Sequence, residues 1–91
     1  MSRITVKEAV RRAIQFLAVV QESNPPEDVT VEEVELSDDG LFWLITIGAF
    51  PSGSSIAAMT GEGTYRRQYK VFKVDVNSGE VISMKMRDIH Y

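Results

Sequence analysis

The chain has 91 residues, 44% of them hydrophobic and 25% charged, and this balance excludes a disordered segment. The absence of cysteine excludes a disulfide framework and a thiolate metal site. The net charge of -3 is mild, and the first residues lead into an amphipathic pattern without the apolar stretch of a signal peptide. We therefore expect one domain over residues 1–91, located in the cytoplasm.

A capping box marks the start of the first predicted element, a helix. Thr5 is followed three residues later by Glu8, the spacing at which the two side chains satisfy each other's backbone amides. Apolar residues then recur at helical spacing and form a wide stripe that faces a core. The stripe consists of Val6, Ala9, Val10, Ala13, Leu17 and Val20. Asn24-Pro25-Pro26 ends the helix, because proline cannot continue the hydrogen-bond ladder.

Two strands follow, joined by Asp38-Asp39-Gly40. Residues 29–36 alternate in polarity but change parity at Glu32-Glu33, which predicts a bulge there or a strand that begins after it. Residues 41–50 are apolar on both faces, so both faces of this strand need a cover.

The turn between these strands decides which side chains share a face. If Asp39-Gly40 is a two-residue type I′ turn, Leu36 lies opposite Trp43 and Val34 opposite Ile45. A three-residue loop would exchange the faces of the second strand. We prefer the first register because it keeps the glutamates off the face that carries Trp43, which we expect to be buried beneath the helix.

The second half of the chain predicts another hairpin after a long loop. Residues 51–63 are small and glycine-rich, with an apolar centre at residues 56–59. We expect a third strand over residues 64–76, a three-residue turn that places Gly79 in the left-handed region, and a last strand over residues 81–87. In this register Val74 faces Ile82, and one face carries Phe72, Val74, Ile82, Met84 and Met86.

These elements predict an α+β fold in which one N-terminal helix packs on a four-stranded antiparallel meander. The segment Val74-Asp75-Val76-Asn77-Ser78-Gly79-Glu80-Val81-Ile82, after a helix and the strand Trp43-Leu44-Ile45-Thr46-Ile47, resembles the closing hairpin of PepSY domains. The chain also resembles small NTF2-like immunity proteins, and both families wrap a sheet around a helix in the cystatin manner. The resemblance implies a non-catalytic module that binds a partner, often a peptidase or a toxin. No cystatin-type inhibitory loop motif is present, so protease inhibition is assigned to no residue.

The residues that could carry chemistry have simpler interpretations. His90, the one histidine, is next to the C-terminus, where no scaffold would position it as a base. Asp38-Asp39 precedes a glycine and is typical of a turn. The glycines of residues 51–63 do not form a phosphate-binding motif. We therefore predict no catalytic residue, no cofactor and no metal.

Charge is unevenly distributed along the chain. Seven carboxylates and no basic residue lie between Glu27 and Asp39, whereas the basic residues Arg66, Arg67, Lys70 and Lys73 accompany Tyr65 and Tyr69. Basic residues interleaved with aromatics occur in single-strand binders, but the acidic total argues against nucleic acid as a partner. Solvated strand faces and cross-strand pairs explain both clusters better.

The sheet face away from the helix is the predicted binding surface. It carries Phe42, Leu44, Thr46, Phe50, Tyr69 and Val71, and the chain has no second helix to cover it. A large exposed apolar patch usually marks an interface, so we predict a homodimer or a complex with a protein partner through this face, and no membrane contact.

Two alternatives remain open. The 51–63 loop could cover the outer face through Ile56 and Met59. The protein could instead be a small-ligand-binding or enzymatic domain, with a pocket between the helix and the curved sheet near Trp43 and the same loop.

Overall fold

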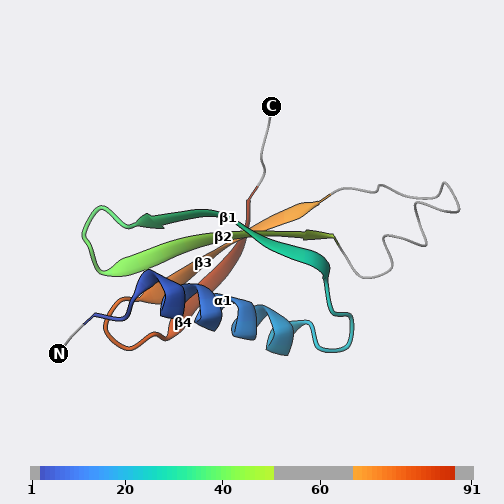
Figure 1. The fold of residues 1–91 in the computed structure, drawn as a ribbon, viewed down its shortest axis with the longest axis horizontal. Coiled ribbons are helices and arrows are strands. Elements are labelled where there is room, and N and C mark those ends of the chain that lie inside the picture. Colours follow the sequence, from blue (N-terminus) through green and yellow to red (C-terminus); the bar gives the residue numbers. More distant parts are fainter. Residues whose placement is uncertain (1–2, 51–66, 88–91) are drawn as a thin grey trace, which may run out of the picture.

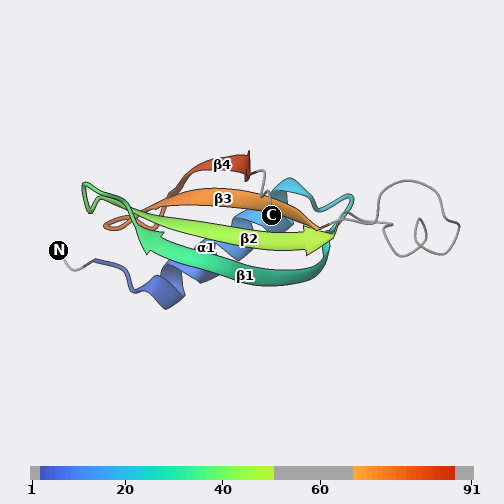
Figure 2. The same ribbon diagram turned by 90° about the horizontal axis from the view of Figure 1, so that it is seen from above.

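One helix lies across one face of a four-stranded antiparallel sheet (Figure 1). The computed structural model describes residues 3–50 and 67–87. The elements are α1 (Val6–Val20), β1 (Glu27–Leu36), β2 (Phe42–Phe50), β3 (Gln68–Asp75) and β4 (Val81–Arg87). The strands are ordered β1-β2-β3-β4, and α1 crosses beneath them obliquely (Figure 2). The predicted α+β fold, with one helix on a four-stranded meander, is confirmed.

The helix begins where the capping box predicts. The Thr5 hydroxyl accepts a hydrogen bond of 3.1 Å from the Glu8 amide, and Glu8 binds Arg11 and Arg12 through its carboxylate. Of the predicted stripe, Ala9, Ala13 and Leu17 are buried, whereas Val6 and Val20 are exposed. The two small alanines let the helix backbone approach the sheet closely, so the buried stripe is narrower than the sequence pattern.

The core lies between α1 and the middle of the sheet. Ile45 and Ile47 of β2 and Phe72 and Val74 of β3 are buried against the helix. The Phe16 ring meets Phe72 edge to face, with ring centroids 6.3 Å apart. Trp43 is half-buried at the rim of this core, where its indole nitrogen donates to the Ile4 carbonyl over 3.4 Å. Trp43 was expected to be buried beneath the helix, but it is only half-buried, because this residue lies at the start of β2, near the beginning of α1.

The first hairpin has the predicted register and a different turn. Leu36 pairs with Trp43 and Val34 with Ile45, and a register irregularity between Val31 and Glu33 confirms the predicted bulge. However, a type I′ turn requires positive φ at both central residues, and Gly40 has φ +74 while Asp39 does not have positive φ. The Gly40 amide donates to the Ser37 carbonyl and the Ser37 amide to Phe42, so the loop is longer and runs from residue 38 to 41.

The second hairpin has the predicted strand register away from its turn but a different register beside the turn. Gly79 has φ +76, and Phe72 pairs with Met84, as expected. An irregularity after Lys73 then places Val81 opposite Val74, so Val81 packs against the core and Ile82 is exposed. The predicted pairing of Val74 with Ile82 is wrong by this one residue. The exposure of Met86 follows from its place near the end of β4.

The predicted third strand is only partly described. Its residues 64–66, the loop 51–63 with Ile56 and Met59, and His90 lie outside the described residues. Strand β3 ends at Asp75, one residue before the predicted end. Val76 is buried beyond it and donates its amide to the Leu41 carbonyl, which ties the two hairpin turns together.

The turn between β3 and β4 is held by a carboxylate and gives a pH prediction. The amides of Ser78 and Asn77 donate to Asp75 over 2.9 and 2.8 Å, and these bonds hold the pKa of Asp75 below its usual 3.8. A lowered native pKa stabilises the fold above the pKa of the unfolded chain, about 3.9, and the stabilisation is lost as pH falls through the native value. Asp75→Asn keeps an acceptor but removes the charge. We expect its unfolding temperature to fall less than that of the wild type between about pH 5 and pH 2, measured by circular dichroism; equal falls would contradict this account.

Candidate functional site

The six predicted binding residues share the sheet face that points away from α1. In the strand register Thr46 lies beside Val71 and Gly48 beside Tyr69, on the side opposite to the buried Ile45 and Ile47. Thr46 is buried. The other five, which are half-buried, are Phe42, Leu44, Phe50, Tyr69 and Val71. The face is therefore assembled as predicted, but its side chains are less exposed than those of an open apolar patch.

Cations from β3, from β4 and from Arg67 just before β3 lie over this outer face. The Lys73 ammonium is 4.2 Å from the centre of the Phe42 ring, and the Arg67 guanidinium is 5.0 Å from that of Phe50. Arg87 reaches from β4 to Thr46 on β2 and Glu33 on β1, over 3.0 and 3.1 Å. Cations placed in this way attract the ring faces and shield them from solvent.

The acidic strand β1 supplies carboxylate partners for the two arginines. Arg67 contacts Asp28 at 3.1 Å and Glu32 at 3.3 Å, and it also hydrogen-bonds the Thr30 hydroxyl. Together with the pair between Arg87 and Glu33, these contacts join β1 to strands that are not its neighbours. The predicted cross-strand pairing is therefore confirmed for Arg67 with Asp28 and Glu32, while Glu33 pairs with Arg87, which is outside the basic cluster.

A glycine makes room for the Arg67 contacts. A Cβ at Gly48 would lie 2.8 Å from a Glu32 carboxylate oxygen and 3.1 Å from an Arg67 guanidinium nitrogen. Sequence analysis did not single out Gly48. A glycine within an otherwise apolar strand is the available signal, because such a glycine often marks a close approach by another group.

The helix side of β1 is the apolar surface that the sequence did not reveal. Among the described elements, α1 packs against β2, β3 and β4, and every residue of β1 is exposed. Val31, Val34 and Leu36 pair with Ile47, Ile45 and Trp43, so their side chains lie on the helix side. We call these three residues the open row. They are 37–41% exposed.

The width of a helix explains why the open row is uncovered. Strands lie about 4.8 Å apart, so the axes of four strands span about 14 Å. A helix is about 10 Å across with its side chains and covers two or three strands. Phe16 and Val19 line one depression with Val81 of β4, so that flank of α1 faces β4. Since α1 packs mainly on the inner strands, it leaves the residues of β1 exposed in the described part of the chain.

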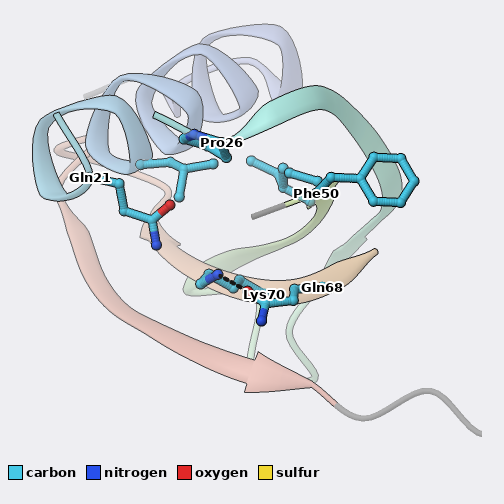
Figure 3. A pocket seen from close by; sticks show the side chains of 8 residues that line it. Gln21, Pro26, Phe50, Gln68 and Lys70 are labelled. Carbon is cyan, nitrogen blue, oxygen red and sulfur yellow. Dashed lines mark hydrogen bonds between the residues drawn. The ribbon is translucent and has the colours of Figure 1, made fainter. Parts of the chain in front are cut away.

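A small cavity lies between the end of α1 and the sheet (Figure 3). Its volume is about 20 Å³, which is room for about one water molecule. It lies at the Phe50 end of β2, whereas Trp43 is at the other end of that strand, so it is not the pocket near Trp43 that was considered from the sequence. Figure 3 shows the Phe50 ring turned away from Gln21 and Lys70. The eight lining residues are Leu17, Gln21, Pro26, Ile47, Ala49, Phe50, Gln68 and Lys70.

The carboxylate pair at residues 38 and 39 forms part of a turn, as predicted. The Ser37 hydroxyl and the Leu41 amide donate to Asp39 over 2.6 and 3.0 Å, and these bonds lower the pKa of Asp39. Within residues 3–50 and 67–87, no group of three His, Cys, Asp or Glu side chains could hold a metal ion.

The described residues define an α+β domain with one helix on an antiparallel sheet. Comparison with family models, with curated proteins and with solved structures finds no match to this chain. The resemblance to PepSY domains and to NTF2-like immunity proteins therefore stays a prediction. In the part of the chain that the structure describes, no helix has the length and apolar character needed to cross a bilayer.

Proposed function

We propose that this protein is a non-enzymatic protein-binding module, and that the open row on β1 is part of its binding surface. The observation that supports this proposal is the exposure of Val31, Val34 and Leu36 beside a helix that packs mainly on the other three strands. Aliphatic side chains in a row on a sheet face gain about 25 cal/mol for each Å² that a partner removes from water.

The partner element that fits this surface is an amphipathic helix. The exposed part of the helix-side face is about one strand wide, or about 5 Å by the strand spacing above, so a second helix would contact it with one side and extend past the edge of the sheet. Such a helix would lie beside α1 and place its apolar side on the open row, as grooves that bind amphipathic helices do. It would complete the second layer of the α+β sandwich.

The outer face supports the proposal less well. Its rings at Phe42 and Phe50 already contact Lys73 and Arg67, and a partner would have to displace these cations or pack over them. The small-ligand alternative has weaker support still, because the cavity beside the end of α1 has room for about one water molecule, and the larger depressions on the flanks of α1 are open to solvent.

Affinity capture with matched variants tests the module. The immobilised protein is exposed to an extract of its native host, and captured proteins are identified by mass spectrometry. We expect the wild type and the control Glu35→Lys, which changes the opposite face of the same strand, to retain the same partner. Val34→Lys with Leu36→Lys should lose it, because two charges would be placed on the apolar surface.

A further variant in the same assay compares the two faces. Phe42→Glu with Leu44→Lys changes the outer face, and we expect it to keep the partner if it remains folded by circular dichroism. If only this variant lost the partner, the binding surface would have to be assigned to the outer face. A wild type that captures nothing specific, or that turns over a small substrate, would contradict the proposed function.

A further inference from the structure

The two edges of the sheet are protected to different degrees. Strand β1 has two register irregularities, a positive φ at Asp28 and carboxylates along most of its length. Bulges and charges of this kind discourage pairing with a further strand. Strand β4 pairs with β3 without irregularity from Ser83 to Arg87 and contains no proline. Its outer edge, which pairs with no other strand among the described residues, is therefore the regular one.

One of the two cations on β4 points away from that edge. Arg87 donates to Thr46 on β2 and to Glu33 on β1, so its guanidinium lies over the outer face of the sheet. Lys85 is the other cation, and it is exposed. Because Arg87 is engaged elsewhere, β4 carries less charge at its edge than its sequence indicates.

Exposed apolar side chains lie along this edge and beside it. Met86 and Ile82 of β4 are 61% and 49% exposed, and Val19 of α1 is 70% exposed. Val19 and Phe16 lie on the flank of α1 that faces β4, since they share a depression with Val81. A regular strand edge and an apolar flank thus occur together.

We propose that β4 pairs antiparallel with β4 of a second copy, about a two-fold axis at Met84, and joins the two sheets into one. The proposal rests on the proposed function in treating the chain as a binding module, and it adds a second surface with a named occupant. Both helices would lie on the same face of the joined sheet. The contact would be isologous and closed, so it would end at a dimer.

The pattern of β4 is complementary to itself in this arrangement. Antiparallel pairing about Met84 places Ile82 opposite Met86 of the second copy, and Met84 opposite its own counterpart. Ser83 then faces Lys85, so two lysines do not meet directly. Cross-strand apolar pairs stabilise a sheet, and like charges directly opposite destabilise it. The acidic, bulged β1 of a second copy would not present a comparable partner.

A pair of charge variants tests this register within one chain. Ile82→Lys with Met86→Lys puts lysine opposite lysine at two symmetric places, whereas Ile82→Lys with Met86→Glu puts lysine opposite glutamate at the same places. Both positions are exposed, so both variants should fold. Sedimentation velocity should show a wild-type dimer, about tenfold or more weaker association in the first variant, and recovery in the second.

Hydrogen exchange supplies a readout of the backbone pairing itself. We expect amides of β4 to become more protected as the protein concentration rises, while those of β1 do not change. A wild type that is monomeric at all concentrations would overturn the proposal, as would a dimer unaffected by the lysine pair. Neither result bears on whether the open row binds a partner. The capture experiment, which uses substitutions on β1, tests the proposed function separately.

Discussion

Phe72→Ala is expected to lower the free energy of unfolding by about 3–5 kcal/mol, the cost of removing a fully buried ring. Phe72 is 0% exposed and lies between Ile45 of the neighbouring strand and the edge of the Phe16 ring. The alanine variant leaves a cavity under α1, because the helix is held at its distance from the sheet by the surrounding side chains. Urea denaturation followed by circular dichroism gives the value.

Phe72→Leu is the matched control for this prediction. It keeps most of the apolar volume and loses the edge-to-face contact, so we expect a cost of about 1–1.5 kcal/mol. Single domains have unfolding free energies of about 5–15 kcal/mol, so the alanine variant can be partly unfolded at room temperature. A cost below about 1 kcal/mol for Phe72→Ala would mean that α1 does not pack on β3 as described.

The hairpin registers could be predicted because side-chain parity leaves few choices. A slip of one residue in the first hairpin would have placed the glutamates of β1 on the face that carries Trp43 and would have moved Val34 and Leu36 to the opposite face, and avoiding this selected the observed pairing. The turn itself could not be predicted in the same way. Asp39-Gly40 is compatible with a two-residue turn, but the Ser37 hydroxyl and Asp39 carboxylate stabilise a longer loop with the same register.

Side-chain parity could not predict the strand register beside the second turn. Val81 and Ile82 are both aliphatic and adjacent, so the sequence offers no preference for which of them enters the core. The Asp75 bonds to the turn amides and the pairing of Val74 with Val81 decide the matter in the folded chain. This shift exposes Ile82, which is one of the residues on which the proposed dimer rests.

The exposed surfaces were predicted least well, because they depend on how one element covers another. One helix was expected to cover a whole sheet face, so open apolar surface was predicted only on the other face. The helix covers β2, β3 and β4 and leaves the open row. On the outer face, Arg67 and Arg87 reach residues that are 35 or more positions away in the chain, and no local pattern indicates such contacts.

Trp43→Ala is expected to lower the free energy of unfolding by about 2–4 kcal/mol, somewhat less than truncation of a fully buried aromatic residue. Trp43 is half-buried, packs at the rim of the core and donates from its indole nitrogen to the Ile4 carbonyl. The Ile4 amide donates to Val76 over 2.7 Å, so Trp43 helps to hold the segment before α1 against the end of β3. Loss of the ring should loosen this segment as well as the core. Circular dichroism is the appropriate probe, because the substitution removes the one tryptophan.

Two further variants separate packing from the hydrogen bond. Trp43→Phe keeps an aromatic ring and removes the indole donor, so we expect a loss of about 1 kcal/mol beyond the change in ring size. Leu41→Ala removes an exposed side chain nearby and should change stability by less than about 0.5 kcal/mol. A Trp43→Ala variant as stable as Leu41→Ala would contradict the register of the first hairpin. Since Val34 and Leu36 are placed on the helix side by that register, it would also remove the open row from the proposed binding surface.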